Sequence, residues 1–541
     1  MSNKPFAITL DVGTSLANRT GSWRTVKPTY VNRLPPCNAK CPAGEKCQAW
    51  LYKAESGNYR QAWEEIIQEN PFPACMGRVC YHPCEGACNR GSLDEAVGIN
   101  SVERFLGDHA LEKDWRFEKA AQSTGKKILV VGAGPAGLSA AYHLARMGHF
   151  VHIVESAPAA GGMMRYGIPK YRLPREILQA EIDRILALGI ELELNREVTD
   201  LQQEMADGGY DAAFLGVGAS LARRAYIPAG DAAHVVDAVS VLRSMEGQEQ
   251  PMLGRRVVVY GGGNTAVDVA RTAKRLGAEP LLVYRRTRDR APAHDFEIEE
   301  AIEEGVNMKW LSTIKAADEG EIKIEKMELD ADGRPQPTGE FETVGADSVV
   351  LALGQETNLS FIQGLEKVTQ EYGSVVVDKQ MMTGMPGVFA GGDMVPGERN
   401  VTVAIGHGKT AARAIDAYVN GVTLEAPEQL EPVTLEQMNT WYYADAPKML
   451  RPHLNLVRRQ TTFEEVLQGL TEDTALFEAR RCMSCGNCFE CDNCYGVCPD
   501  NAIIKLGAGK KFKINYEYCK GCGICEQECP CGAIEMVKES I

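Results

Sequence analysis

The positions of the cysteines constrain this chain more than any other feature of its sequence. Of its 18 cysteines, seven lie between Cys37 and Cys88, eleven lie between Cys482 and Cys531, and none lies in the stretch that separates them. A disulfide framework is typical of short secreted domains, whereas this chain has 541 residues and no apolar signal-peptide core in Met1–Gly21. Clustered thiols in a reducing compartment are more often metal ligands. We therefore expect metal centres at both ends of the chain and a different chemistry in the middle.

The C-terminal cysteines form two copies of the spacing found in bacterial two-cluster ferredoxins. The first run is Cys488-x2-Cys491-x2-Cys494-x3-Cys498-Pro499, and the second is Cys519-x2-Cys522-x2-Cys525-x3-Cys529-Pro530. In such a pair the fourth cysteine of each run ligates the other cluster. The predicted ligand sets are therefore Cys488, Cys491, Cys494 and Cys529 for one cluster, and Cys519, Cys522, Cys525 and Cys498 for the other. A zinc ribbon is the alternative, and the doubled run argues against it.

Three C-terminal cysteines remain outside these runs, namely Cys482, Cys485 and Cys531. The first two continue the two-residue spacing upstream, so a register in which they ligate stays open. We expect all three to be buried or structural, because a free cysteine behaves as a small hydrophobe.

Two βαβ patterns in the Cys-free middle indicate two dinucleotide-binding units, which form an internal repeat. In the first, the apolar run Lys127–Val131 leads into glycines and an amphipathic stretch, Ala136–Met147, and a second apolar run ends at Glu155. Such a turn lets a pyrophosphate approach a helix N-terminus, and the acid is placed for a ribose hydroxyl. The candidate residues are Gly132, Gly134, Pro135, Ala136, Gly137 and Glu155.

The second unit differs from the first at its ribose position. Its candidate loop residues, after the strand Arg256–Tyr260, are Gly261, Gly263, Asn264 and Thr265. No acid ends its second strand, and Arg285 and Arg286 stand there instead. Guanidinium groups pair bidentately with phosphate oxygens, so these arginines favour NADP(H) over NAD(H). The alternative is that they lie in a solvated loop or bind the pyrophosphate.

Several motifs around these units resemble those of a known family. Gly387-Val388-Phe389-Ala390-Gly391-Gly392-Asp393 resembles the flavin-contacting segment of flavoproteins with two dinucleotide-binding domains. A closer resemblance is to the small subunit of NADPH-dependent glutamate synthase. The residues that carry it are Gly161-Gly162-Met163, Tyr166-Gly167-Ile168-Pro169, Arg172-Leu173-Pro174 and Val403–Gly408. The resemblance runs from about Pro36 to Asn420.

That resemblance implies that the first unit binds FAD and the second binds the nicotinamide nucleotide. It adds Gly162, Gly392, Asp393 and Val403 to the candidate flavin contacts. Members of this family pass hydride from NADPH to FAD and electrons onward to clusters. A disulfide reductase would need a redox-active cysteine pair beside its flavin, and the middle of this sequence has none. The synthase domains of the large subunit are also absent from the sequence, so glutamate synthesis is not expected of this chain alone. No catalytic acid–base residue is predicted.

The resemblance also implies two 4Fe–4S clusters near the N-terminus, although the Cys-x2-Cys pair expected before Cys37 is missing. The visible pieces are Cys37-x3-Cys41-Pro42 and Cys80-x3-Cys84-x3-Cys88. Our hypothesis is that Cys47 and Cys75 replace the missing pair. One cluster would then use Cys41, Cys80, Cys84 and Glu103, which falls where a related dehydrogenase family has a non-cysteine ligand. The other would use Cys37, Cys47, Cys75 and Cys88. The alternative is a single cluster, with Cys47 and Cys75 as buried hydrophobes.

The expected fold class is α/β, with two Rossmann-like domains, an N-terminal helical iron–sulfur domain and a C-terminal α+β ferredoxin-like domain. The predicted boundaries are 1–119 for the helical domain, 120–250 and 346–425 for the FAD-binding domain, 251–345 for the NAD(P)H-binding domain, 426–476 for a linker and 477–541 for the ferredoxin domain.

Charge and hydropathy exclude some partners. The net charge of −15 and the pI of about 5.3 argue against nucleic acid or an anionic membrane as the main partner. No apolar run reaches the roughly 18 residues that a membrane span needs. The expected compartment is the cytoplasm, and a homodimer is the usual oligomeric state for such a chain.

Together these features predict an NAD(P)H:acceptor oxidoreductase that passes electrons through FAD and 4Fe–4S clusters to a partner redox protein, or in the reverse direction. Relatives with a similar ferredoxin module serve larger redox enzymes, including 2-oxoacid oxidoreductases and dissimilatory sulfite reductase, which favours a catalytic subunit as the partner. The alternatives are a free-standing ferredoxin:NADP oxidoreductase and, disfavoured by the intact glycine loops, a non-enzymatic assembly subunit. No pattern predicts the terminal acceptor or the direction of flow, because cluster potentials depend on hydrogen bonding and exposure.

Overall fold

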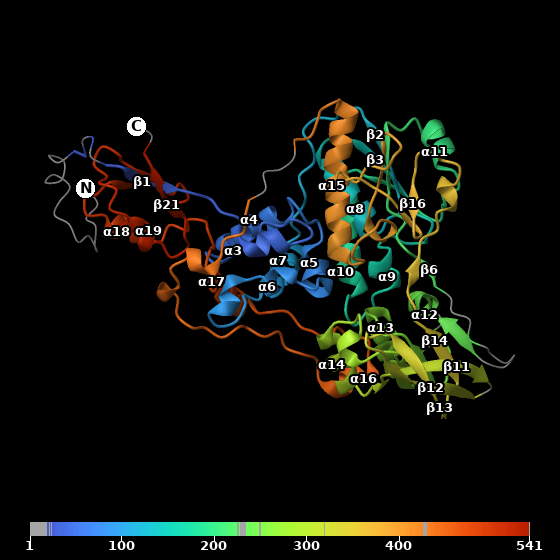
Figure 1. The fold of residues 1–541 in the computed structure, drawn as a ribbon. Helices are drawn as coiled ribbons and strands as arrows, with labels where there is room; N and C mark the ends of the chain where they lie inside the picture. The colour runs from blue at the N-terminus through green and yellow to red at the C-terminus, as the bar shows by residue number, and fades with distance from the viewer. Residues whose placement is uncertain are drawn as a thin grey trace.

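The structure is a computed structural model that describes residues 19–20, 22, 24–223, 227, 234–247, 250–318, 320–425 and 430–539. The molecule is elongated: a ferredoxin module lies at one end, a helical domain follows, and two Rossmann-like domains lie together at the other end (Figure 1). The predicted α/β class with parallel sheets is confirmed.

The first Rossmann-like domain is built on a five-stranded parallel sheet with the order β18-β5-β2-β3-β4. Its strands are β2 (Lys127–Val131), β3 (Phe150–Val154), β4 (Glu191–Glu193), β5 (Ala212–Leu215) and β18 (Val388–Ala390). Every residue of β5 is buried, as expected for a parallel strand covered on both faces. Helices α8 (Pro135–Arg146) and α15 (Val401–Asn420) pack against each other beside this sheet (Figure 1).

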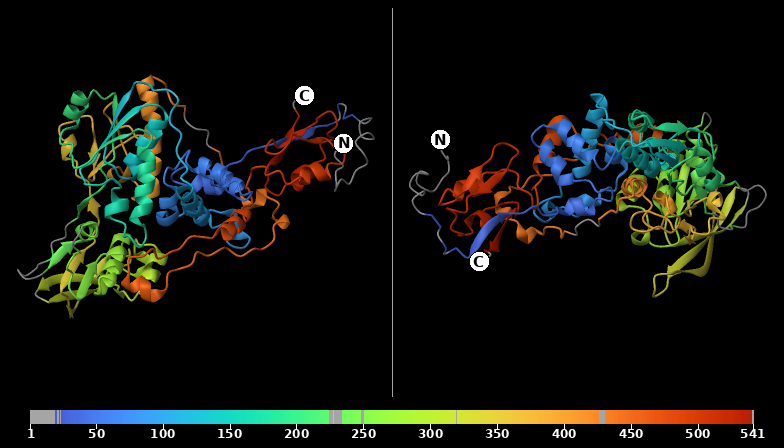
Figure 2. Two further views of the ribbon diagram at one scale, coloured as in Figure 1. Left: turned by 180° about the vertical axis from the view of Figure 1, so that it is seen from behind. Right: turned by 90° about the horizontal axis from the view of Figure 1, so that it is seen from above.

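The second Rossmann-like domain has a parallel sheet with the order β10-β9-β8-β14-β7. Its strands are β7 (Val235–Asp237), β8 (Arg256–Tyr260), β9 (Glu279–Val283), β10 (Asn307–Lys309) and β14 (Ser348–Leu351). The predicted limits of 251–345 were too narrow, because β14 pairs with both β8 and β7 and so brings two strands from outside them into the sheet. An antiparallel sheet of β11 (Ser312–Asp318), β12 (Glu321–Leu329) and β13 (Pro335–Gly345) extends from this domain (Figure 2).

The helical domain carries the N-terminal cysteines. Its helices are α2 (Pro36–Lys40), α3 (Cys47–Ala54), α4 (Tyr59–Ile66), α5 (Pro73–Val79), α6 (Pro83–Gly86) and α7 (Ile99–Glu112). Helices α5 and α7 approach closely because glycines face the partner backbone. A Cβ on Gly77 would lie 2.3 Å from the Cα of Arg104, and one on Gly107 would lie 2.3 Å from the nitrogen of Ala74. Small residues at both contact points therefore set the separation of this helix pair.

The ferredoxin module includes a strand from the start of the described chain. The module contains α18 (Asn493–Val497), α19 (Ile524–Gln527) and the pair β19 (Ile503–Lys505) and β20 (Phe512–Ile514). Strand β1 (Val26–Tyr30) pairs antiparallel with β21 (Ile534–Lys538). The Arg24 guanidinium and the Thr20 hydroxyl also donate to the carbonyl of Cys519. The prediction that placed residues 1–119 in one helical domain was wrong for β1, which belongs to the ferredoxin module.

The segment between α15 and the ferredoxin module wraps over its neighbours (Figures 1 and 2). Its helix α16 (Leu456–Thr461) packs on α13 (Asn264–Arg275) of the second Rossmann-like domain. Helix α17 (Glu472–Arg480) then packs on α7 and α3 of the helical domain. The segment therefore ties three domains together. In the described part of the chain, no helix combines the length and the hydropathy needed to cross a membrane.

Candidate functional site

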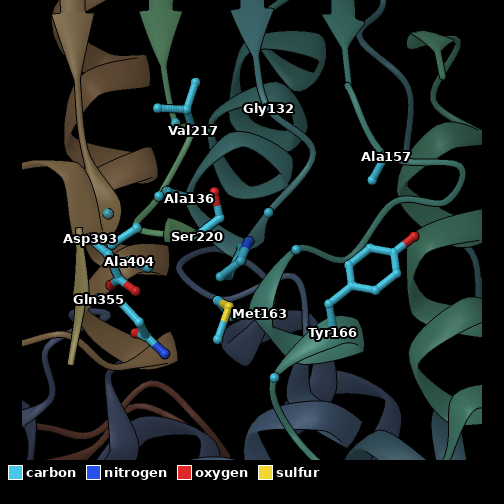
Figure 3. A pocket seen from close by; sticks show the side chains of 18 of the residues that line it. Gly132, Ala136, Ala157, Met163, Tyr166, Val217, Ser220, Gln355, Asp393 and Ala404 are labelled. Carbon is cyan, nitrogen blue, oxygen red and sulfur yellow. The ribbon is translucent and has the colours of Figure 1, made fainter. Parts of the chain in front are cut away.

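The first candidate site is a pocket at the carboxyl ends of the strands of the first Rossmann-like domain (Figure 3). It has an open volume of about 1870 Å³, part of which is continuous with solvent. Ligands of open α/β sheets bind at this edge. The predicted residues that line it are Gly132, Gly134, Pro135, Ala136, Glu155, Gly162, Gly392 and Asp393, together with Asn264 and Thr265 from the second domain.

Glu155 directly follows β3, lines this pocket and is largely buried. Its carboxylate accepts hydrogen bonds from the backbone N–H groups of Ala133, at 2.7 Å, and Ala157, at 2.8 Å. These bonds lock the carboxylate beside the glycine loop, where lone pairs remain for a ribose hydroxyl. The arrangement therefore fits the adenosine end of a dinucleotide.

The glycines of the loop approach neighbouring backbone so closely that side chains at these positions would collide with it. A Cβ on Gly137 would lie 1.9 Å from the carbonyl oxygen of Gly132, and one on Gly162, which has a φ of 50°, would lie 2.7 Å from the Cα of Gly134. Gly137 does not line the pocket, so its role is close packing of helix α8 on the loop. The loop backbone and the helix N-terminus thus form an anion cradle.

The segment around Asp393 forms the opposite wall (Figure 3). Burial raises the pKa of Asp393, and Arg399 partly opposes that shift. The nitrogen of Gly392 donates to His407 Nδ1 at 3.2 Å, and burial lowers the pKa of this histidine, so His407 holds the turn in its neutral form. Val403, which was predicted as a flavin contact, does not line this pocket. Its nitrogen donates to the helix cap Asn400 Oδ1 at 2.9 Å, and Ala404 lines the pocket instead.

The second glycine loop opens onto a separate pocket. Of the residues predicted there, Gly261, Gly263, Thr265, Arg285 and Arg286 line it. The Nε atom of Arg286 is buried and has no hydrogen-bond partner in the described structure. The neighbouring Arg288, by contrast, pairs with Glu299 at 2.9 Å. An unsatisfied guanidinium donor beside a glycine loop fits a phosphate oxygen.

Tyr81 was not predicted as a site residue, yet it links the helical domain to the second Rossmann-like domain. Tyr81 follows Cys80 in the helical domain and lines the large pocket. Its hydroxyl accepts a hydrogen bond from Asn264 Nδ2 at 2.6 Å, and its ring stacks on His294 with centroids 3.7 Å apart. Asn264, at the start of α13, therefore faces the large pocket. No pattern in the sequence marks Tyr81 except its place next to a cysteine.

One predicted cluster set is brought together beside this pocket. Cys41, Cys80, Cys84 and Glu103 line one small pocket, and Cys47 lines it as well. Glu103 Oε1 accepts from Asn70 Nδ2 at 3.1 Å. Burial raises the pKa of Glu103 well above its usual value, and the charges of Glu45, Cys41 and Cys84 raise it further. A cationic iron core would relieve this accumulation of negative charge.

The second predicted N-terminal set is not assembled. Cys75 lines neither this pocket nor the one that holds Cys37 and Cys88. It lies fully buried in the first turn of α5, where the nitrogens of Ala74 and Cys75 donate to Glu181 at 3.0 and 2.9 Å. Burial raises the pKa of the Cys75 thiol well above its usual value. The structure thus corrects the prediction that Cys75 joins Cys37, Cys47 and Cys88.

Cysteines of both predicted ferredoxin sets pack in the core of this module. Burial raises the pKa of Cys494 to about 12. The charges of Cys491, Cys488 and Cys529 add to this shift. Burial likewise raises the pKa of Cys525 to about 12, with contributions from Cys494, Cys498, Cys519 and Cys522. Thiols within each predicted set are thus close enough to affect one another, and the division into two ligand sets stays a prediction. Cys491 and Cys522 are exposed, so both centres lie near the surface.

Three family models match the chain. The model described as pyridine nucleotide-disulphide oxidoreductase matches residues 126–408. The model described as dihydropyrimidine dehydrogenase domain II, 4Fe-4S cluster, matches residues 31–115, and the 4Fe-4S dicluster domain matches residues 487–533. The matches cover the two Rossmann-like domains, the helical domain and the ferredoxin module in turn.

Characterised relatives combine the same parts. The chain is 36% identical to the NADP(+)-dependent formate dehydrogenase subunit beta of Moorella thermoacetica, over 83% of this chain and 70% of that protein. It is 32% identical to the NADPH-Fe(3+) oxidoreductase subunit beta of Geobacter sulfurreducens, over 85% and 77%. It is 34% identical to the glutamate synthase (NADPH) small chain of Escherichia coli (strain K12), over 70% and 88%. The chain therefore belongs to the pyridine nucleotide-disulphide oxidoreductase family and is an FAD- and NAD(P)H-dependent iron–sulfur oxidoreductase of the glutamate synthase small-subunit type.

Proposed function

We propose that this chain is an electron-transfer subunit that carries electrons between NADPH and a partner redox protein. Bound FAD would exchange hydride with the nicotinamide and single electrons with the clusters, which is why a flavin stands between the two. The chain's own residues bind the two nucleotides, hold the flavin against the helical domain and ligate the clusters.

The observation that carries this proposal is the direct contact between the flavin pocket and the first cluster pocket. Val79 and Tyr81 line the flavin pocket, and Cys80 between them lines the cluster pocket. In the same way Val401 lines the flavin pocket and Thr402, the next residue, lines the cluster pocket. A single thickness of chain therefore separates the two centres at two places. Such an arrangement suits electron transfer and would serve no purpose in a nucleotide-binding assembly protein.

The choice of NADPH rests on the second loop. Arg285 and Arg286 line its pocket, and no carboxylate follows β9 as Glu155 follows β3. A ribose carboxylate would repel a 2′-phosphate, whereas guanidinium groups bind it. The relatives named above include proteins whose names carry NADP(+) or NADPH, which supports the same choice.

The partner is proposed to bind at the ferredoxin module. This module lies at the end of the molecule opposite the two Rossmann-like domains (Figures 1 and 2). Its exposed Cys491 and Cys522 bring both centres to the surface, where an acceptor can approach them. The relatives named as beta subunits or small chains support a catalytic subunit as the partner.

The test is anaerobic stopped-flow absorbance of the purified chain mixed with NADPH or, separately, NADH. The proposal predicts that the flavin and cluster bands bleach together and that NADPH is faster. Faster bleaching with NADH would overturn the assignment of Arg285 and Arg286. Flavin bleaching without cluster bleaching would overturn the electron-transfer role, and co-purification of the endogenous partner would identify the acceptor as a catalytic subunit or as a free ferredoxin.

A further inference from the structure

A second pocket lined by thiols lies where the two ends of the chain meet. Its walls carry four cysteines, two from each end of the sequence: Cys37, Cys88, Cys482 and Cys485. The rest of the wall is mainly apolar, with Pro35, Leu51, Val97, Ile99 and Met483. We propose that these four thiolates ligate a 4Fe–4S cluster whose ligand set is shared by the N-terminal helical domain and the segment that precedes the ferredoxin module.

The loop that carries Cys482 and Cys485 is pinned against the helical domain. Helix α17 ends just before it, and the buried Arg481 donates to Glu478 at 2.6 Å and to the carbonyl of Glu95 at 2.6 Å. Arg90 in turn donates to the carbonyl of Arg481 at 2.7 Å. These bonds leave the loop little freedom to move away from Cys88, which lies two residues before Arg90.

The turn between the two cysteines has a constrained backbone. Ser484 has a φ of 49°, in the left-handed region that a residue with a side chain adopts only under constraint. Its hydroxyl accepts a hydrogen bond from Gln48 Nε2 at 3.2 Å, in the buried interior. This turn projects the thiols of Cys482 and Cys485 into one pocket, and the two-residue spacing between them is the one seen in ferredoxin ligand runs.

The segment that leads to Cys37 is fixed to the same loop. The nitrogen of Arg33 donates to the carbonyl of Gly486 at 3.0 Å, and Asn487 Nδ2 donates to the carbonyl of Arg33 at 3.1 Å. The two parts of the chain, more than four hundred residues apart in sequence, are therefore held in register next to the four thiols. These hydrogen bonds fix the two segments that carry the cysteines relative to each other.

Little positive charge faces this pocket. Arg90 is the cationic side chain on the pocket wall, and its guanidinium is already bound by Asp94 at 2.7 Å and by two carbonyls. Four thiolates gathered in this pocket would therefore need a cationic centre to offset their charge, which iron supplies.

A cluster fits this geometry better than a single ion. A zinc ion needs its four ligand atoms at about 2.0–2.3 Å from one point. No group of three or more His, Cys, Asp or Glu side chains converges in that way within the described residues. The thiolates of a 4Fe–4S cluster each bind a different iron, so they surround a core and do not meet at one point.

The proposed cluster would complete a continuous route. Ile99 lines both this pocket and the pocket of Cys80, and Cys47 stands between them. Hydrogen bonding with Cys37 and then with Cys41 and Cys84 raises the pKa of Cys47 well above its usual value, which places Cys47 against both thiol groups. On the other side, Cys488 of the first ferredoxin quartet follows Cys485 by three residues. The proposal rests on the cysteine geometry and not on the direction or nucleotide preference proposed above.

The test uses full-length variants in which serine replaces cysteine at one end of the chain, at the other end, or at both. With four clusters the wild-type chain should hold about sixteen iron atoms, and Cys37→Ser, Cys482→Ser and the double variant should each hold about twelve. The losses should not add, because the two thiols belong to one cluster. EPR spectra of the dithionite-reduced proteins should lose the same signal in all three variants. Cys75→Ser is the matched control and should keep all of its iron.

FAD content and the EPR signals of the ferredoxin clusters distinguish a missing ligand from a misfolded chain. Retention of both, together with the loss of about four iron atoms, supports the proposal. Full iron in Cys482→Ser and in Cys485→Ser would overturn it. Additive losses in the double variant would also overturn it, because the two cysteines would then serve different clusters. If every serine variant lost FAD as well, Cys482→Ala and Mössbauer quantification of the remaining cubane iron would decide between a lost ligand and a lost fold.

Discussion

At the scale of single residues, we expect Arg285 and Arg286, which line the pocket of the second glycine loop, to set the nucleotide preference. Arg286→Ala should raise the KM for NADPH roughly 10- to 100-fold, because a hydrogen bond to a charged group is worth about 1.5–3 kcal/mol. The KM for NADH, which lacks the 2′-phosphate, should stay the same. Steady-state kinetics with an artificial acceptor measures both values.

The control for this prediction is Arg288→Ala. Arg288 lies two residues away but pairs with Glu299 and Asp295. Its removal should change the KM for NADPH less than twofold, since surface ion pairs contribute about 0–1 kcal/mol to stability and nothing to this pocket. An equal loss in both variants would mean that the arginines act through general charge and not through a phosphate contact.

Alanine variants of two glycines can distinguish a loss of packing from a loss of ligand binding. Gly263 has a φ of −94°, and a Cβ at this position would have no protein atom within 4 Å, whereas a Cβ on Gly137 would collide with the carbonyl oxygen of Gly132 at 1.9 Å. Gly263→Ala should therefore keep its FAD and its unfolding temperature while NADPH binding weakens, because the methyl group occupies the approach of the pyrophosphate. Gly137→Ala should lose FAD and unfold at a lower temperature.

Flavin fluorescence after heat release, thermal unfolding and NADPH titration of the two glycine variants provide the measurements. Full FAD occupancy in Gly137→Ala would contradict the close packing of α8 on the first loop. Unchanged NADPH affinity in Gly263→Ala would mean that the pyrophosphate approaches elsewhere.

At the scale of elements, a buried carboxylate holds three helices together. Glu304, at the end of α14 (Asp295–Glu303), accepts from Arg271 and Arg275 of α13 at 2.7 Å each and from Arg459 of α16 at 3.3 Å. Burial alone would raise the pKa of Glu304, but the hydrogen bonds from Arg271 and Arg275 outweigh it and lower the pKa to about 2. The carboxylate therefore couples the second Rossmann-like domain to the connecting segment.

Glu304→Gln should destabilise the chain by about 3–5 kcal/mol at neutral pH, because buried guanidinium groups lose their counter-charge. The folded-state pKa lies below the ordinary value of 4.5. The stabilisation is thus fully present above about pH 4.5 and is lost as the pH falls toward 2. The free-energy difference between wild type and variant should be constant from pH 8 to about 5 and shrink below that range. Denaturant unfolding monitored by circular dichroism at several pH values tests this.

Glu303→Gln is the matched control, since Glu303 also pairs with Arg459, at 3.0 Å, but is 61% exposed. Its effect should be at most about 1 kcal/mol. If the two variants were equally stable, the buried carboxylate would not be the element that joins these helices.

The elements also show how far sequence reasoning reaches in this chain. Both glycine loops and both ferredoxin quartets were predicted from local spacing, because the ligating groups of each lie on one turn or in one short run. The pairing of β1 with β21 was not predicted, since nothing in Val26–Tyr30 indicates a partner near the other end of the chain. Local patterns specify loops, whereas contacts between distant segments depend on the packing of whole domains.

The N-terminal cysteines illustrate the same limit. Spacing alone made Cys75 as good a ligand as Cys47, but Cys75 lies in a helix turn that is capped by Glu181 from α10 (Arg175–Leu186). Cys482 and Cys485 lay outside every predicted set, because their partners lie at the opposite end of the sequence. A count of unassigned cysteines and their Cys-x2-Cys spacing was the signal available, and only the fold could say which thiols they would meet.

At the scale of the whole molecule, the two Rossmann-like domains, the helical domain and the ferredoxin module follow one another along its length (Figure 1). In such a series each centre passes electrons to its neighbour, and removal of a middle centre should interrupt flow without affecting entry. Cys37→Ser should therefore let NADPH reduce the flavin at the wild-type rate while the ferredoxin clusters are reduced much more slowly. Freeze-quench EPR after mixing with NADPH follows both events in one experiment.

Cys522→Ser tests the opposite break, because Cys522 is an exposed predicted ligand of the ferredoxin module. In this variant the flavin and the N-terminal clusters should be reduced as in wild type, and only delivery to an external protein acceptor should slow. Wild-type reduction of the ferredoxin clusters in Cys37→Ser would mean that electrons bypass the middle of the molecule. Because the helical domain lies between the flavin domain and the module, such a bypass would require the ferredoxin module to leave the position in which β1 and the connecting segment hold it.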